Sequence, residues 1–320
     1  MESATLTYAL GSFLTISNND LFNVPFFWKM ANRSNFKIVY STGLIIISLL
    51  TILSFSFLEP LMPHDANTSK ITKKKAAERA IGEKTDSTLR VLLFSGTGWY
   101  RHPGIPVING WLVRTGVQHG MLIDVSETGR DISEESLEQY DVLILNNANV
   151  LEKVLNEEQR KAIEDWYSAG GGIVALHAVL VHQDGWPWIM DLGGCDFNSD
   201  SEFLKAKVKV DLNATNHPTV KGWGTEFWYE ADWTNHSRSV TGLPGIQVLL
   251  RVDESTYDPV RDHFKDLGGK PMGNDHPIAW TRIWKNGRFF YTELGHDIRA
   301  LDTEFGRQHI MNGIKWVAEK

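Results

Sequence analysis

Three histidines stand where predicted β-strands end. They are His102, His177 and His296, which follow the apolar runs 89–95, 173–176 and 288–294. In an open parallel sheet the carboxyl ends of the strands share one edge, and ligands bind in the loops beyond that edge. We therefore expect the three imidazoles to converge, although they are far apart in the sequence.

Side chains of this kind are suited to proton transfer or to metal binding. Imidazole exchanges protons near neutral pH, and three imidazoles can hold a divalent cation such as zinc. The histidines lack the His-x-x-x-His spacing of a helical metal motif, so only the fold can bring them together. The sequence requires no cofactor. The alternative is that each histidine has a structural role, in which its buried ring forms hydrogen bonds with buried backbone groups.

Several other kinds of chemistry and partner are poorly supported. Cys195 is the single cysteine of the chain, which rules out an internal disulfide and a cysteine metal cluster. No Gly-x-Ser-x-Gly motif offers a serine nucleophile. The net charge of -7 and the isoelectric point near 5.9, without a basic stripe, argue against nucleic-acid binding. The sequence leaves the oligomeric state open.

An alternation of strands and helices must position the histidines. The predicted strands are 89–95, 121–125, 141–146 and 173–176, and the helices between them are 105–117, 133–140 and 156–169. The helix from Asn156 has Gln159 three residues on, which is typical of a capping box. Short strands separated by helices predict a parallel sheet covered by helices on both faces.

The second half of the chain adds antiparallel strands. We expect strands at 206–210, 246–252, 278–284 and 288–294, followed by a final helix over 303–318. The pair Asn286-Gly287 is typical of a hairpin turn. The predicted fold class is a three-layer α/β sandwich with a mostly parallel, flavodoxin-like central sheet and added antiparallel strands.

The amino-terminal part predicts a membrane anchor. Residues 38–58 are uncharged, apolar and long enough to span a bilayer as a transmembrane helix. The basic residues before this run place 1–37 in the cytoplasm as a tail, and a linker over 59–88 then leads to an exported domain over 89–320. One alternative is a signal peptide that starts at Met30 and is cleaved, giving a secreted protein. Another is a cytosolic enzyme with a spurious extension.

Residues 89–320 resemble the ThuA-like family, named for trehalose utilisation. The matching segments are Arg101-His102, Tyr140-Asp141-Val142-Leu143, Gly170 to His177, Asp184 to Trp188, Asn216-His217-Pro218, His276 to Arg282, Gly287 to His296 and Asn312-Gly313-Ile314. The resemblance implies the fold of class I glutamine amidotransferases. It also implies a link to disaccharide and keto-sugar metabolism, with a small sugar as the partner.

Two departures from related proteins bear on the chemistry. In the amidotransferases the turn after the fourth strand carries a cysteine nucleophile, whereas here it carries His177. Glutamine amidotransfer is therefore not expected. Family members commonly have an adjacent Asp-Glu pair, whereas Glu230 and Asp232 are split by Ala231. Residues i and i+2 of an extended segment share a face, so both carboxylates are expected near one ligand.

One catalytic hypothesis follows for a sugar that carries a carbonyl group. His177 removes the proton alpha to the carbonyl, and His102 or Asp232 protonates the departing glycosidic oxygen, so that the bond breaks by elimination. His296 and Glu230 complete the expected catalytic residues. The expected sugar-binding residues are Trp186, Trp188, Trp233, Arg101 and Asn147. The alternative function is a non-catalytic carbohydrate-binding or scaffold domain.

Overall fold

The computed structural model describes residues 88–319. The predicted tail over 1–37 and membrane span over 38–58 lie outside the described residues, as does the linker up to residue 87. Between residues 88 and 319, no helix has both the length and the apolar character that a membrane crossing needs.

A nine-stranded sheet forms the middle of the domain, in the order β2-β1-β3-β4-β11-β10-β9-β6-β7. Five neighbouring strands are parallel, namely β1 (Leu89–Phe94), β2 (Met121–Ser126), β3 (Val142–Asn146), β4 (Gly172–Leu176) and β11 (Gly287–Thr292). Both β3 and β4 are buried along their whole length, as expected of central strands with helices on both faces.

The other four strands extend the sheet in antiparallel fashion. They are β10 (Pro277–Trp284), β9 (Ile246–Asp253), β6 (Leu204–Val210) and β7 (Glu226–Ala231). Two short strands, β5 (Phe197–Asp200) and β8 (Thr234–His236), pair beside this sheet. They matter for function because residues of both line the cavity described below.

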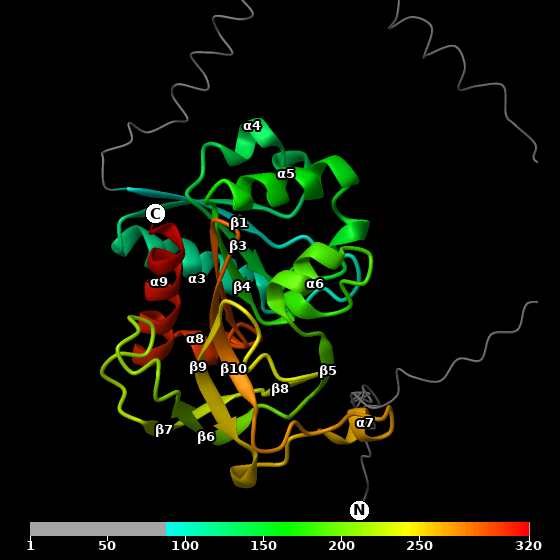
Figure 1. Cartoon of the computed structure of the whole chain (residues 1–320), viewed down its shortest axis with the longest axis vertical. Helices are drawn as coiled ribbons and strands as arrows, with labels where there is room; N and C mark the ends of the chain where they lie inside the picture. Colours follow the sequence, from blue (N-terminus) through cyan, green and yellow to red (C-terminus); the bar gives the residue numbers. More distant parts are fainter. Residues whose placement is uncertain (1–87, 320) are drawn as a thin grey trace, which may run out of the picture. The chain divides into compact units, whose positions relative to one another are not determined.

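Helices cover both faces of the sheet. The helices of the described domain are α3 (Ile105–Gln118), α4 (Glu134–Leu137), α5 (Glu157–Ser168), α6 (Pro187–Gly193), α7 (Asp262–Lys265), α8 (Ile298–Leu301) and α9 (Glu304–Ala318). Figure 1 shows α3 and α9 on one side of the strands and α6 on the other. The described domain is therefore a three-layer α/β sandwich, consistent with a flavodoxin-like fold.

The strand sequences explain the two cores. Successive side chains of a strand point to opposite faces. Val174 of β4 therefore packs with Ile310 of α9 in one core, whereas its neighbour Ile173 packs with Ile163 of α5 in the other. A run of apolar residues without alternation supplies both cores at once.

Two glycines allow α9 to lie close against the sheet. A Cβ on Gly172 would stand 2.4 Å from the carbonyl oxygen of Val317, and a Cβ on Gly313 would stand 2.2 Å from the ring of Phe290. Neither approach leaves room for a side chain. The helix is thereby held over β4 and β11, whose carboxyl ends carry His177 and His296.

The fold predicted from the sequence is confirmed in its main features. The first four strands, the helices between them and the terminal helix all form near the predicted bounds. The short elements β5, β7, β8, α6, α7 and α8 were not predicted. Each is seven residues or fewer, too short for a clear apolar period.

Candidate functional site

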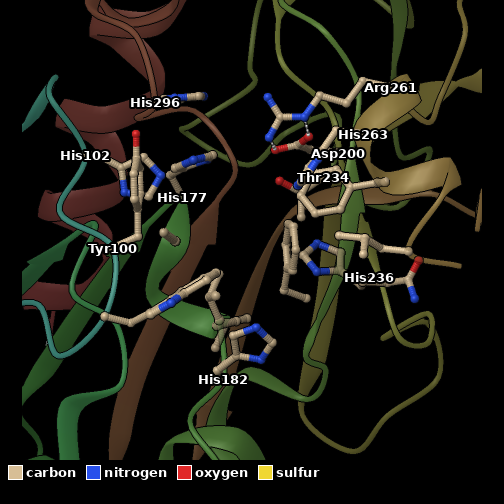
Figure 2. A pocket seen from close by; sticks show the side chains of 18 of the residues that line it. Tyr100, His102, His177, His182, Asp200, Thr234, His236, Arg261, His263 and His296 are labelled. Carbon is tan, nitrogen blue, oxygen red and sulfur yellow. Dashed lines mark hydrogen bonds and ion pairs between the residues drawn. The ribbon is translucent and has the colours of Figure 1, made fainter. Parts of the chain in front are cut away.

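A cavity of about 660 Å³ lies beyond the carboxyl ends of β1, β4 and β11. Its walls come from the loops that follow these strands and from β5, β8 and α7. Figure 2 shows the three histidines of the strand ends on one side of it. Arg261, Asp200, Thr234 and His236 lie on the other side. This is the edge at which open α/β sheets bind ligands.

The structure brings His102, His177 and His296 together. Their ring centroids are 4.8 to 5.1 Å apart, with His177 stacked on His296 and His102 edge-on to both. One nitrogen from each ring can be chosen so that all three lie within 4.8 Å of one another. We call these residues the histidine centre.

His177 occupies a sharp turn between β4 and a short 3-10 helix. Its backbone has φ +54° and ψ -108°, a combination that residues with a side chain rarely adopt. Its N–H donates to the carbonyl of Thr292, and its Nδ1–H donates to the carbonyl of Glu293 at 3.2 Å. The second bond leaves Nε2 as the free ring nitrogen. The strained turn therefore presents one defined imidazole atom to the cavity.

Two glycines let the loops of the histidine centre meet. A Cβ on Gly104 would stand 2.5 Å from the carbonyl oxygen of His296. Gly295 has φ +149°, and a Cβ there would come within 3.2 Å of the Cβ of His177. The approach of the three loops thus depends on glycine beside two of the three histidines.

Asp232 is the carboxylate of the histidine centre. Nδ1–H of His296 donates to its Oδ2 at 2.7 Å, and Nε2 of His177 lies 3.9 Å from the same oxygen. Burial raises the pKa of Asp232, but His177 and the hydrogen bond from His296 outweigh burial and hold it below its ordinary value. The same hydrogen bond raises the pKa of His296 against the effect of burial.

The other two histidines are held in the neutral form. Burial, helped by the two neighbouring imidazoles, lowers the pKa of His102 to about 2. Burial also lowers the pKa of His177 to about 4, although the charge of Asp232 opposes it. A neutral imidazole has a lone pair, which is what a metal ion requires of a histidine ligand.

The segment 232–236 forms part of the opposite wall. Alternate residues of an extended chain point to one side, and Asp232, Thr234 and His236 follow this rule. Thr234 and His236 line the cavity, and Asp232 contacts His296. Among the described residues, neither ring nitrogen of His236 has a hydrogen-bond partner.

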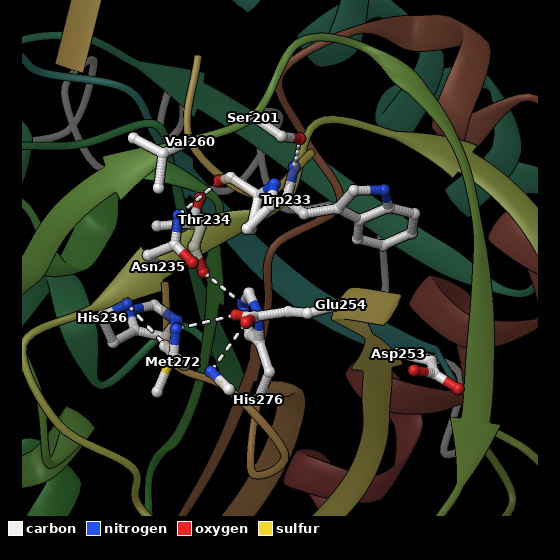
Figure 3. Close-up of polar contacts among 12 residues, drawn as sticks. Ser201, Trp233, Thr234, Asn235, His236, Asp253, Glu254, Val260, Met272 and His276 are labelled. Carbon is white, nitrogen blue, oxygen red and sulfur yellow. Dashed lines mark hydrogen bonds and ion pairs between the residues drawn. The ribbon is translucent and has the colours of Figure 1, made fainter. Parts of the chain in front are cut away.

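The buried His276 and the partly buried Glu254 support this wall. Nε2–H of His276 donates to the carbonyl of Thr234 at 2.7 Å, and its Nδ1 lies 2.8 Å from Oε1 of Glu254 (Figure 3). Glu254 also accepts hydrogen bonds from the backbone of Met272 and Gly273, each at 2.7 Å. The wall is thus tied to the end of β9.

Asp200 and Arg261 form an ion pair on the cavity wall. Nε of Arg261 lies 2.6 Å from Oδ1 of Asp200, and Nη2 donates to Oδ2 at 3.1 Å. Burial raises the pKa of Asp200 to about 7, although the charge of Arg261 opposes the rise. Asp200 is therefore a carboxyl that can exchange a proton near neutral pH.

The tryptophans expected to bind sugar lie elsewhere. Trp186 and Trp188 stack on each other at 5.6 Å, and Trp188 also packs on Tyr167 in the core beside α5. Trp233 is fully buried in the other core. None of the three lines the cavity, because each packs with one of the two apolar cores.

The expected polar binding residues are also outside the cavity. Arg101 makes a bidentate ion pair with Glu127 at the surface. Asn147 is buried, and its side-chain amide donates a hydrogen bond to the carbonyl of Gly295. The expectation that Glu230 and Asp232 share a face is not met. Glu230 is exposed within β7, whereas Asp232 lies past the end of that strand, where the chain turns inward.

Sequence reasoning missed several cavity residues, above all Asp200, His236, Arg261, Trp99 and Tyr100. Two of them, His236 and Tyr100, could have been found from their spacing in the sequence. The spacing Asp232-x-Thr234-x-His236 is a period of two, and Tyr100 stands two residues before His102. Asp200 and Arg261 had none, because each depends on a short strand or loop that only the tertiary structure places.

The fold and the site together define a flavodoxin-like α/β domain with a three-histidine centre at its strand ends. The chain belongs to the ThuA family, described as trehalose utilisation, whose match covers residues 90–317. This confirms the family expected from the sequence motifs. Among curated proteins, none matches the chain.

Solved structures of ThuA-like proteins share the fold. One from Bacteroides uniformis has a TM-score of 0.61 and 22% identity, covering 74% of this chain and 94% of its own. One from Parabacteroides merdae has a TM-score of 0.55 and 19% identity, covering 72% and 90%. At these identities the likeness concerns the fold alone.

Proposed function

We propose that this domain is a sugar-processing enzyme whose catalytic centre is the histidine centre, with His102, His177 and His296 holding a divalent cation such as zinc. The observation that carries the proposal is their convergence, with ligand atoms within 4.8 Å, at one end of a cavity of about 660 Å³. The sugar is inferred from the family, which is described as trehalose utilisation.

The donor set fits a cation. Nδ1–H of His177 is bound to a backbone carbonyl and Nδ1–H of His296 to Asp232, so both rings keep Nε2 for a ligand bond. Histidine ligands of metals usually have such a partner on the other nitrogen. Nδ1 of His102 is buried without a hydrogen-bond partner among the described residues. Three protein ligands and an open position are typical of a catalytic zinc site.

A bound cation would polarise a carbonyl or hydroxyl oxygen of the sugar. The chain's own part in the reaction is to orient the ligands and to move a proton. Asp232 orients His296 through the hydrogen bond between them. In this proposal His177 serves as a ligand, because its lowered pKa makes it a weak proton acceptor.

In this proposal Asp200, in place of His177, is the residue that transfers the proton. Its carboxylate accepts the proton alpha to the sugar carbonyl, the C–H electron pair becomes a carbon–carbon double bond, and the glycosidic C–O bond breaks. Asp200 then returns the proton to the departing oxygen, so the elimination balances without a second acid. A pKa near 7 suits a group that both accepts and donates a proton.

Turnover of a keto-disaccharide by the full chain tests this function. We expect the His177→Ala variant to lose turnover and bound cation, and Asp200→Asn to lose turnover while keeping the cation. The control His119→Ala alters an exposed histidine at the end of α3 and should change neither. Unchanged turnover in His177→Ala would contradict the proposal. Sugar binding without turnover by the wild type would favour the carbohydrate-binding alternative.

We also propose that residues 38–58 anchor the protein in a membrane, with the domain outside the cytoplasm. The support is the uncharged apolar run and the basic residues before it. Extraction of membranes with alkaline carbonate should leave the full chain in the pellet. Its release into the supernatant would favour the cleaved signal peptide, and recovery from the cytosol would contradict export.

A further inference from the structure

Two large aromatic side chains stand exposed at the cavity. Trp99 is 60% exposed and Tyr100 is 49% exposed, yet both line the cavity together with His102. Most other tryptophans of the described domain are buried or half-buried. Trp228 of β7 is similarly exposed, but it lies outside the cavity lining. Exposed aromatic faces that line a cavity are available to a ligand.

These two residues begin a continuous row of rings. Ring centroids are 6.5 Å apart from Tyr100 to Trp99, 5.0 Å from Trp99 to His182, 6.4 Å from His182 to Phe197 and 5.4 Å from Phe197 to Phe264. All five residues line the cavity, and we call them the aromatic rim. They come from four separate segments: the loop after β1, the loop before α6, β5 and α7.

The aromatic rim starts at the histidine centre. The ring of Tyr100 packs edge-on to the ring of His102 at 4.7 Å. A ligand held at the histidine centre therefore has aromatic surface directly beside it. The contrast with Trp186 and Trp188 is sharp, since those rings are covered by one another and by the core.

We propose that the aromatic rim is the binding site of the second sugar ring of the substrate, with one ring at the histidine centre and the next on Trp99. The C–H face of a sugar ring is apolar and packs against aromatic faces, while its hydroxyls stay in water at the open mouth. The cavity of about 660 Å³ lies well inside the range of ligand pockets, about 300–1,000 Å³. The inference rests on the proposed function for the chemical class of the ligand.

Calorimetric titration of the full chain tests the aromatic rim. The probe is trehalose, which lacks the carbonyl group that the proposed elimination needs, and it is compared with the matching monosaccharide. We expect the wild type to prefer the disaccharide. Trp99→Ala should weaken disaccharide binding about tenfold, which corresponds to an aromatic contact of about 1.4 kcal/mol, and leave monosaccharide binding nearly unchanged. Trp99→Phe should keep most of the preference.

The matched control is Trp228→Ala, because Trp228 is 52% exposed on β7 and lies outside the cavity lining. It should leave both affinities unchanged. If the wild type binds disaccharide and monosaccharide equally, or if Trp99→Ala keeps the preference, the aromatic rim proposal is wrong while the proposed function stands. If the wild type binds none of these sugars, the proposed function fails and the aromatic rim proposal fails with it.

Discussion

Nδ1 of His296 lies 2.7 Å from Oδ2 of Asp232, which joins the loop after β11 to the residue that follows β7. The two residues are 64 positions apart in the sequence and belong to the parallel and the antiparallel parts of the sheet. This hydrogen bond fixes the ring orientation of His296. It also connects the histidine centre to the wall that carries Thr234 and His236.

The first prediction concerns this hydrogen bond. Asp232→Asn should weaken cation binding about 10–100-fold, because the carboxylate partner of a ligating histidine sets its orientation and basicity. Competition with a chromophoric chelator measures the affinity. Glu230→Gln is the matched control, since Glu230 is exposed outside the cavity lining, and it should have no effect. A wild-type protein that takes up no cation would contradict the metal proposal itself.

The second prediction concerns the close approach at Gly104. Gly104→Ala places a methyl group against the carbonyl of His296 and should destabilise the fold by about 1–3 kcal/mol and reduce turnover. Gly110→Ala is the control, because Gly110 lies in α3 with only the guanidinium of Arg114 nearby, at 3.7 Å. It should stabilise the helix by up to about 1 kcal/mol. Urea unfolding compares the two variants. Equal changes in the free energy of unfolding would show that a methyl group is accommodated at position 104.

The third prediction separates packed from exposed tryptophans. Trp186 is buried and its Nε1–H donates to Glu164 at 2.8 Å, so Trp186→Ala should lower the free energy of unfolding by about 3–5 kcal/mol. Trp99→Ala should change it by less than about 0.5 kcal/mol, because Trp99 is largely exposed. If Trp186→Ala kept its stability and lost sugar binding, Trp186 would be a binding residue as the sequence suggested.

The fourth prediction concerns the stability of the cavity wall as a function of pH. Burial raises the pKa of Glu254, but hydrogen bonds from His276, Met272 and Gly273 outweigh it and hold the pKa below the ordinary value of 4.5. The folded state therefore binds the proton less readily than the unfolded state. The carboxylate stabilises the fold above pH 4.5, and this contribution is lost as the pH falls through the folded-state pKa.

Comparison of Glu254→Gln with the wild type measures this contribution. The variant should be less stable at pH 7, and the gap should narrow below pH 4.5. Urea unfolding at a series of pH values gives the gap directly. A gap that is the same at pH 7 and pH 3 would mean that the charge of Glu254 contributes nothing to stability.

The sequence by itself determined the parallel part of the sheet, and it predicted that the three histidines lie at the carboxyl ends of its strands. Runs such as 173–176 are apolar without alternation, which is the pattern of a strand buried on both faces. The carboxyl ends of parallel strands meet at one edge, so His177, which directly follows its run, is placed there by topology, whereas His102 stands well past its run and is placed by its loop. For this reason His102, His177 and His296 could be grouped before their distances were known.

Only the tertiary structure decided which other side chains share the cavity. Trp186 and Trp99 are alike as residue types, and packing alone sends one into the core and leaves the other at the cavity. Asp200 and Arg261 come from short segments that lack an apolar period, and they meet through contacts between distant parts of the chain. The local sequence pattern determines which face of a strand a residue occupies. Contacts between residues that are distant in the sequence depend on the packing of the whole domain.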